Sequence, residues 1–244
     1  MKEKTRLNKM ISQTGFCSRR EADKLIETGR VKVNGKIPEM GLKVDYNDLI
    51  TVDGKPILEK PDPVYIAFHK PVGITSTTDK KDPDNMIDYI NYPERLFHIG
   101  RLDKDSEGLI FLTNDGDIVN KILRAENGHE KEYIVTVDHA ITHDFILKMS
   151  KGVKILDTVT LPCKVEKINK KTFRIILTQG LNRQIRRMCS TLGYKVVKLK
   201  RIRIMNVKLD GIEYGHYRKF TKKELSDINK LISNSSKWWR RLYE

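Results

Sequence analysis

The chain has 244 residues, and its 39% hydrophobic content is enough for the core of one large domain or of two smaller ones. Lysine and arginine outnumber aspartate and glutamate by 47 to 32, and the formal charge of +15 indicates a polyanionic partner, either a nucleic acid or an anionic membrane surface. No apolar run approaches the roughly 20 residues that span a bilayer, and the basic N-terminus lacks the apolar stretch of a signal peptide, so we expect a soluble, cytoplasmic protein.

The cysteines and histidines carry no metal or redox signature. Cys17, Cys163 and Cys189 are far apart and form no CxxC pair, so we expect ordinary reduced thiols. The six histidines show no HExxH motif and no close grouping with cysteine. The sequence therefore predicts no bound transition metal.

The first sixty residues predict a small basic unit. Residues 5–15 and 19–29 have helical apolar spacing, and Ser18 with Glu21 forms a capping box before the second helix. Apolar alternation at 31–33 and 49–52, each followed by an Asn-Gly or Asp-Gly turn, predicts a hairpin-rich sheet. The basic side chains of this unit predict a face that binds an RNA backbone, with a merely solvated face as the alternative: Arg6, Lys9, Arg19, Arg20, Lys24, Arg30 and Lys32.

The sequence RLNKMISQTGFCSRREADKLIETGRVKVNG, at residues 6–35, resembles the S4 RNA-binding module, including its SRREA run and its VNG turn. The resemblance implies contact with structured RNA through shape and phosphates rather than through a base code. The EKPDP segment that follows has the composition of a short, semi-rigid linker. We therefore expect an S4-like domain at residues 1–60 and a second domain at residues 61–244.

A polar turn in the second domain is the first candidate for chemistry. The strand predicted at 64–68 runs into Lys70 and Pro71, which would present a cation at a sheet edge, and residues 75–84 suit a mobile loop over a substrate. The sequence HIGRLDKDSEGL, at 98–109, feeds an apolar strand and would display Asp103 on a rigid scaffold. The alternative is a salt-bridged turn, the role that we expect for Asp105 and Glu107.

Further elements follow in order. We predict helices at 118–123, 145–149 and 221–232, and strands at 129–137, 153–155, 163–168 and 172–177. Tyr133 shares a strand face with Val135 and Val137, where a tyrosine is more often part of the core. Trp238 and Trp239 near the C-terminus could stack on bases, but packing on the protein or disorder is the expected state.

A second basic stretch, residues 179–209, contains nine basic residues and no acidic one. A helix at 183–192 would place Ile185 and Met188 on one face. It would leave Arg183, Arg186 and Arg187 to face a phosphate track or a buried carboxylate. The strands predicted after this helix would add to the positive field, and basic strands that are merely solvated are the alternative: they carry Lys195, Lys198, Lys200, Arg201 and Arg203.

Three motifs in this order, GRLDKDSEGLIFLTNDGD, the KEY of Lys131 to Tyr133, and QGLNRQIRRM, resemble the RsuA family of pseudouridine synthases. NGHEKEYIVTV and RIRIMNV resemble its RluF-like branch, which implies a large-subunit ribosomal RNA target. The resemblance implies an α+β chain: a small S4-like (α-L) domain, then a synthase domain on a mixed, largely antiparallel sheet in two halves with a central cleft. It also implies no cofactor and a monomer.

The resemblance implies roles for single residues. Asp103 takes the place of the essential aspartate, Tyr133 of the active-site tyrosine, and Arg186 of the arginine paired with the aspartate. The resemblance also implies substrate-binding residues. Ile185 would be the apolar neighbour of Arg186, Lys70 and Pro71 would form the pocket floor, and Arg101 would help to hold the flipped nucleotide. The others are basic residues of the same motifs: Lys131, Arg183 and Arg187.

The implied reaction is an isomerisation of uridine without redox chemistry. Asp103 would act as a nucleophile at the ribose or as a base, and the uridine would be flipped out of paired RNA at a cost of roughly a few kcal/mol. Alternative targets are a tRNA or small-subunit ribosomal RNA. Alternative functions are a non-catalytic RNA-binding or ribosome-assembly protein, and a uridine-cleaving glycosylase or nuclease.

Overall fold

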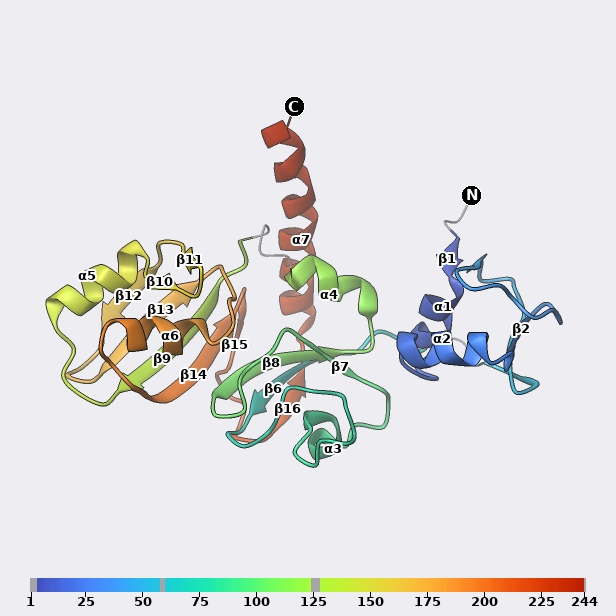
Figure 1. Cartoon of the computed structure of the whole chain (residues 1–244), viewed down its shortest axis with the longest axis horizontal. Helices are drawn as coiled ribbons and strands as arrows, with labels where there is room; N and C mark the ends of the chain where they lie inside the picture. The colour runs from blue at the N-terminus through green and yellow to red at the C-terminus, as the bar shows by residue number, and fades with distance from the viewer. Residues whose placement is uncertain (1–3, 58–59, 124–127, 244) are drawn as a thin grey trace. The chain divides into compact units, whose positions relative to one another are not determined.

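A computed structural model of the chain describes residues 4–57, 60–123 and 128–243. The chain forms two compact units (Figure 1). The first is Met1–Val64 with Pro93–Arg95 and Asn114–Gly116, and the second is Tyr65–Tyr92, Leu96–Thr113 and Asp117–Glu244. Each unit has its own apolar core. Among the described residues, no helix of the chain is both long enough and apolar enough to cross a membrane.

The first unit packs two short helices against small antiparallel sheets. Its core joins the apolar faces of both helices to the strands, with Leu7, Ile11, Ala22 and Val31 almost fully buried. In one sheet β1 pairs with β3, and in the other β4 lies between β2 and β5 and pairs with both. The elements are β1 (Thr5–Arg6), α1 (Leu7–Gln13), α2 (Arg19–Glu27), β2 (Val31–Val33), β3 (Lys43–Val44), β4 (Ile50–Val52) and β5 (Lys55–Pro56).

The predicted capping box is confirmed. The Ser18 hydroxyl accepts a hydrogen bond from the Glu21 amide, and the Glu21 carboxylate accepts one from the Ser18 amide at 2.7 Å. Two amide groups that the helix cannot satisfy internally are thereby satisfied. The helix therefore begins at Arg19, directly after the cap.

The second unit is built on a nine-stranded sheet in two antiparallel halves, as predicted. One half has the order β12-β13-β9-β14, with β15 on β14; the other has the order β8-β6-β16, with β7 on β8. A short parallel pairing between β14 and β8 joins them. The strands are β6 (Tyr65–Lys70), β7 (Phe97–Ile99), β8 (Glu107–Thr113), β9 (Lys131–Val137), β12 (Lys164–Lys167), β13 (Thr172–Leu177), β14 (Val196–Ile204), β15 (Val207–Lys208) and β16 (Tyr217–Lys219).

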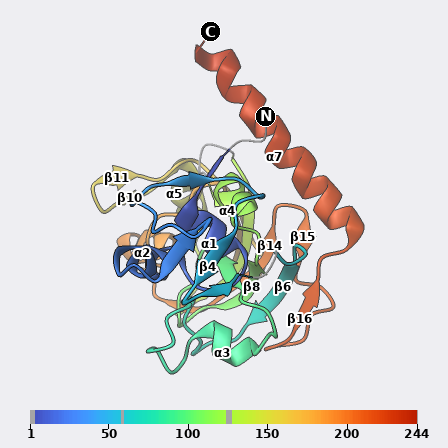
Figure 2. The same cartoon turned by 90° about the vertical axis from the view of Figure 1, so that its right-hand side faces the viewer.

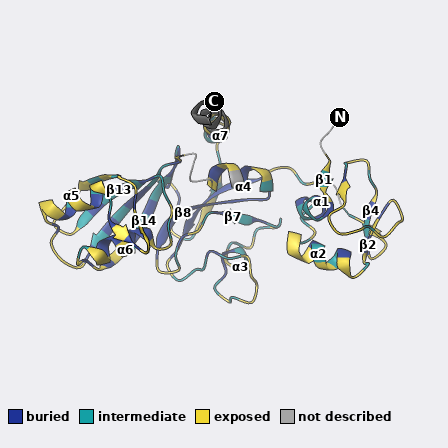
Figure 3. Ribbon diagram, turned by 45° about the horizontal axis from the view of Figure 1, so that its top comes forward, coloured by how far each residue is buried: buried dark blue, intermediate teal, exposed yellow. Residues whose placement is uncertain are grey.

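Each half of the sheet has a core of its own. Helices α5 (His143–Lys151) and α6 (Gln184–Thr191) share one apolar cluster with β9 and β13, next to a hairpin of β10 (Lys154–Ile155) and β11 (Thr158–Val159). Helices α4 (Gly116–Leu123) and α7 (Lys222–Tyr243) share the other with β6 and β8 (Figure 2). All seven residues of β8 are buried (Figure 3), as befits a central strand.

The predicted helices and strands of this unit are present, together with elements that were not predicted. These include α3 (Met86–Ile90), β7, β11 and β16, which are too short to show a period. α7 extends well past residue 232, where the prediction ended it. The side chains of Trp238 and Trp239, for which packing on the protein or disorder was predicted, lie outside the described part of the chain.

A glycine allows the two halves to meet. The parallel pairing places Gly108 of β8 opposite Arg201 of β14. Gly108 has φ +123°, and a Cβ atom there would lie 2.5 Å from the backbone nitrogen of Arg201 and closer still to its carbonyl oxygen. Only glycine permits this conformation and this approach. The start of β8, and with it the turn that carries Asp103, is therefore held directly against β14.

We expect Gly108→Ala to destabilise the protein by roughly 3 kcal/mol, because the new methyl group meets backbone atoms that cannot move independently. Gly193→Ala is the matched control: Gly193 also has positive φ (+83°) but has no atom within 4 Å of the added Cβ, so we expect only about 1–2 kcal/mol. Urea denaturation measures both. Equal losses would contradict the close approach.

Candidate active site

Asp103 lies in the turn between β7 and β8, and its side chain is 33% exposed. The turn is fixed by buried groups on each side of the aspartate. The Ser76 hydroxyl donates to the Leu102 carbonyl at 2.7 Å and accepts from the Leu102 amide at 3.1 Å. Ser106, which is fully buried, donates its amide to the Asp103 carbonyl at 3.0 Å. A partly exposed carboxylate is thus carried by a rigid backbone.

Helix α6 brings two arginines to this carboxylate. Arg183 Nη1 and Arg186 Nε lie 3.6 and 3.9 Å from the same oxygen of Asp103. Arg183 caps the helix with φ +48°, a left-handed conformation that is strained for a residue with a side chain. Ile185, between them, is buried in the same core cluster as Leu102 and anchors the helix in that core. The predicted pairing of Asp103 with Arg186 is therefore a long ion pair, and Arg183 lies nearer.

Arg183 makes closer contacts with Asp105 than with Asp103. The guanidinium donates to both Asp105 carboxylate oxygens, at 3.2 and 2.8 Å, which is the strong bidentate geometry. Burial raises the pKa of Asp105, but the hydrogen bond from Arg183 and the charges of both arginines outweigh it, and the pKa lies below its ordinary value. Asp105 is thus held as a carboxylate that orients Arg183.

Arg186 is committed to the backbone of the same turn. Its Nη2 donates to the Asp105 carbonyl at 2.8 Å and to the Ser106 hydroxyl at 3.0 Å. Its Nε is buried and has no hydrogen-bond partner among the described residues. The nearest acceptor recorded for that nitrogen is Asp103, at 3.9 Å. One charged donor therefore remains available beside the Asp103 carboxylate.

The Asp103 carboxylate makes no hydrogen bond within the described part of the chain, and its contacts are the two long ion pairs. The two neighbouring acids differ. Asp105 has both oxygens engaged by Arg183. Glu107 is 7% exposed and lies 3.2 Å from Lys200. Only Asp103 among the three combines access with unoccupied oxygens.

Tyr133 lies on β9 in the core next to the turn. It is 9% exposed and shares a cluster with Leu102 and Ile185. The neighbouring Glu132 is buried and accepts hydrogen bonds at 2.6 Å from Arg174 and Arg203. Tyr133, Val135 and Val137 share a buried face, as predicted.

Lys70 differs from the prediction. It was expected as a cation presented at a sheet edge, but it is completely buried. Its Nζ donates to the carbonyls of Pro71 and Ile74, both at 2.7 Å, so backbone carbonyls of the turn that follows β6, rather than solvent, satisfy the ammonium group. Burial, with the charge of Arg201, lowers the pKa of Lys70 to about 8, opposed by Asp103 and Asp105.

The other predicted substrate-binding residues are distributed around this centre. Pro71 is buried and accepts the Lys70 hydrogen bond. Burial, with the charge of Arg201, lowers the pKa of Lys131 to about 8. Arg101 is exposed, two residues before Asp103. Arg187 is also exposed, and its guanidinium donates to Asn182 rather than to either aspartate. It is not brought to Asp103 as Arg183 and Arg186 are.

The basic residues predicted on the first unit are exposed, except Lys9, which is half-buried. Arg30 is already paired with Asp53. Arg19 and Arg20 occupy the first turn of α2, where the helix dipole disfavours positive charge. Helix stability does not explain these two arginines, whereas a phosphate backbone would.

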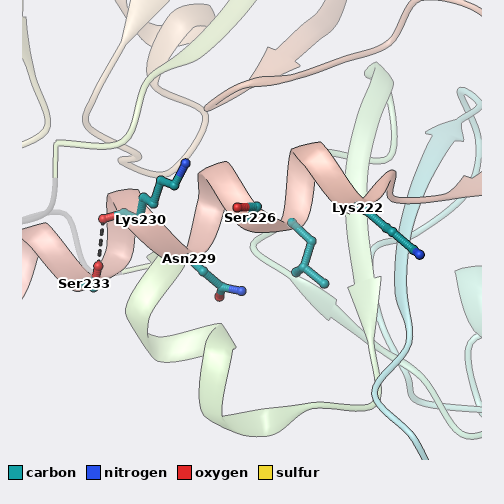
Figure 4. A pocket seen from close by; sticks show the side chains of 6 residues that line it. Lys222, Ser226, Asn229, Lys230 and Ser233 are labelled. Carbon is teal, nitrogen blue, oxygen red and sulfur yellow. Dashed lines mark hydrogen bonds between the residues drawn. The ribbon is translucent and has the colours of Figure 1, made fainter.

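Two cysteines and a surface hollow lie apart from these groups. Burial raises the pKa of Cys163 to about 11, and Cys189 is also raised, so neither thiol is a nucleophile at neutral pH. A hollow of about 560 Å³ on α7 is lined by none of the predicted site residues (Figure 4). No cluster of three metal-ligating side chains occurs in the described residues.

Comparison with known proteins identifies the family to which the chain belongs. Residues 64–191 match the model of the RNA pseudouridylate synthase family, and residues 5–50 match the S4 domain. A crystal structure of a pseudouridylate synthase superposes with a TM-score of 0.67 at 30% identity, covering 93% of this chain and 99% of that one. The chain belongs to the RNA pseudouridylate synthase family and carries an S4 domain.

Two kinds of relative are similar over most of the chain. The dual-specificity RNA pseudouridine synthase RluF of Escherichia coli strain K12 is 59% identical over 233 residues, which are 95% of this chain and 80% of that one. The ribosomal large subunit pseudouridine synthase B of Bacillus subtilis is 37% identical over 238 residues, 94% and 97% of the two chains. The predicted family, its RluF-like branch and the isomerase activity are confirmed.

Sequence reasoning missed two side chains that organise the site. Ser76 was placed in a mobile loop, yet it is 3% exposed and bonded to Leu102. Arg201 was counted with a basic, surface-like strand, yet it is 3% exposed. Its burial has no local signal, because an arginine among the other basic residues of KLKRIRI is expected to lie in solvent. The family motif marks neither residue.

The pKa values of Lys70 and Lys131 predict a pH dependence of stability. The unfolded chain keeps both protons up to about pH 10, whereas the folded protein releases them from about pH 8. The unfolded state then binds more protons, so stability rises with pH between these values. In Lys70→Met we expect the rise in the urea midpoint to be smaller by roughly half, since Lys131 remains. An unchanged rise would contradict the burial of a charged Lys70.

Proposed function

We propose that Asp103 is the reacting carboxylate with which this enzyme converts a uridine of structured RNA into pseudouridine. The observation that carries the proposal is that the Asp103 carboxylate, beside two guanidinium groups, makes only long ion pairs and no hydrogen bond within the described residues. A nucleophile or base needs an unoccupied lone pair and access to the substrate. Asp105 and Glu107 lack one or the other, since Arg183 occupies Asp105 and Glu107 is buried.

The reaction needs only groups of this kind. The bond between C1′ of the ribose and N1 of uracil breaks, the base turns, a bond forms between C1′ and C5, and the proton on C5 is lost while N1 gains one. Asp103 acts first at the ribose or as the base that starts uracil departure, and a base then removes the C5 proton. Atoms and electrons balance without an oxidant, so the product has the mass of the substrate.

Neighbouring residues have positioning roles in this scheme. Arg186 fixes the turn through the Asp105 carbonyl and Ser106, and it leaves Nε beside Asp103. Arg183 adds a second charge, oriented by Asp105. Tyr133 stacks on the uracil once the nucleotide is flipped out, and Arg101 helps to hold it there. Lys70 and Pro71 form the floor of the pocket that receives the flipped uridine, and Ile185 and Lys131 form the wall of that pocket.

The RNA target that we propose is a uridine in large-subunit ribosomal RNA. One relative is named for the ribosomal large subunit, and others are named as dual-specificity enzymes, which supports a second RNA class such as a tRNA. Residues 1–60 act as the RNA-binding domain and residues 61–244 as the catalytic domain. We propose that the enzyme works as a monomer in the cytoplasm, where ribosomal RNA is found.

We expect Asp103→Asn to lower single-turnover pseudouridine formation on ribosomal RNA by at least about 10³-fold, because the carboxamide cannot act as nucleophile or base. RNA affinity and the unfolding midpoint should be unchanged. Asp105→Asn is the matched control, two residues away, and should lose no more than about tenfold because it only loosens Arg183. Full activity of Asp103→Asn would refute the assignment.

The same assay separates the other functions. A non-catalytic RNA-binding or assembly protein would leave every uridine unchanged in the parent enzyme's reaction. A glycosylase would release free uracil, and a nuclease would shorten the RNA. Isomerisation alone preserves mass and chain length and moves the glycosidic bond.

We expect the double variant Arg19→Gln, Arg20→Gln to bind RNA more weakly and to lower the slope of log Kd against log salt by roughly 2, one for each lost phosphate contact. Arg30→Gln should change the slope less, since Arg30 is paired with Asp53. Filter binding over a salt series measures both. An unchanged slope in the double variant would remove these arginines from the RNA contact.

A further inference from the structure

The junction between the two halves of the sheet contains a buried charge that the scheme above does not use. Arg201 of β14 is 3% exposed, and no carboxylate among the described residues lies within ion-pair distance of it. A buried guanidinium without a counter-charge is costly. Its Nη2 is also buried without a hydrogen-bond partner in the described chain, which adds to the cost. Stability alone does not explain this arginine.

The hydrogen bonds of Arg201 go to the backbone on either side of Asp103. Its Nε donates to the Leu109 carbonyl at 2.6 Å, and its Nη1 donates to the Arg101 carbonyl at 3.3 Å. Arg101 precedes Asp103 by two residues, and Leu109 follows it by six. One planar group therefore holds both ends of the turn that carries the aspartate.

The same guanidinium lies near Tyr133, which is the direct partner of Arg201 on the neighbouring strand β9 of the same half-sheet. Its central carbon lies 6.0 Å from the centre of the tyrosine ring, at the limit for attraction between a cation and an aromatic face. Lys70 and Lys131 are also near, since after burial the charge of Arg201 is the next cause that lowers the pKa of each. Several predicted site residues thus surround one side chain.

We infer that Arg201 is a positioning residue for the isomerisation, and that it sets the Asp103 turn against the Tyr133 ring. The inference rests on the proposed roles of those two residues. Gly108 brings the two backbones together at this point, and Arg201 fixes the geometry from there. A lysine is a poor replacement, because one ammonium nitrogen cannot reproduce the fixed spacing of Nε and Nη1, which donate to carbonyls on two different segments while the planar group lies near the ring.

The test measures single-turnover kcat, RNA Kd and the unfolding midpoint for the full-length Arg201→Met and Arg201→Lys variants. We expect both to fold and to bind RNA with unchanged Kd, while kcat falls by about 10²-fold, the cost of a misplaced catalytic group. Arg201→Lys should recover little of the kcat that is lost in Arg201→Met. If Arg201→Met does not fold, Arg201→Lys carries the test alone.

Arg203→Met is the matched control, because it removes a mostly buried arginine from the same strand whose charge is satisfied by Glu130 and Glu132. It should lower the unfolding midpoint and leave kcat nearly unchanged. If the role of Arg201 were purely structural, kcat would fall in proportion to the loss in unfolding midpoint in both Arg201→Met and Arg203→Met. That result would overturn the inference. So does wild-type kcat in Arg201→Met, or a full rescue by lysine.

Asp103→Asn distinguishes this inference from the function on which it rests. If Asp103→Asn is inactive and Arg201→Met is fully active, the proposed nucleophile stands and the positioning role falls. If Asp103→Asn is active, the proposed function itself is wrong. If Arg201→Met and Asp103→Asn together lose no more than Asp103→Asn alone, Arg201 acts through Asp103, as we infer.

Discussion

The close approach of Gly108 to Arg201 is the constraint on which the catalytic unit depends. Two antiparallel half-sheets, each with its own apolar core, meet through only two registered residue pairs of β8 and β14. Such a short parallel pairing is weak by itself. The absence of a side chain at Gly108 lets the backbones meet, and the Arg201 side chain then ties β14 to the turn. Groups carried by different halves can therefore share one site.

The electrostatics of the site follow from how its charges are distributed. Three acids lie close together in the turn, and each has a different environment: Asp105 is bound by Arg183, Glu107 is buried beside lysines, and Asp103 has only long ion pairs. The acid that is best paired orients an arginine, and the acid that is least paired is free to react. Three acids at alternate positions therefore have different roles, because their carboxylate oxygens differ in the hydrogen bonds and ion pairs that they make.

Much of the fold was visible in the sequence because its signals are local. The Ser18 capping box, the strand at Tyr133 and the amphipathic helix at Ile185 follow from spacing. The family motifs located Asp103. Long-range features were not visible: Lys70 was expected to be exposed, and Arg201 resembled a solvated strand residue, because burial depends on which strands lie alongside. The pairing of β14 with β8 joins positions more than ninety residues apart, and no local pattern encodes it.

A crystal structure of the Asp103→Asn enzyme with a uridine-containing RNA would test the central claim most directly. The distance to measure joins C1′ of the target ribose to the carboxamide that replaces the Asp103 carboxylate. We predict about 3.5 Å, the separation of reacting groups before attack, with the flipped uracil on the Tyr133 ring. A uridine still stacked within the RNA, or a C1′ nearer to Asp105 than to position 103, would contradict the account.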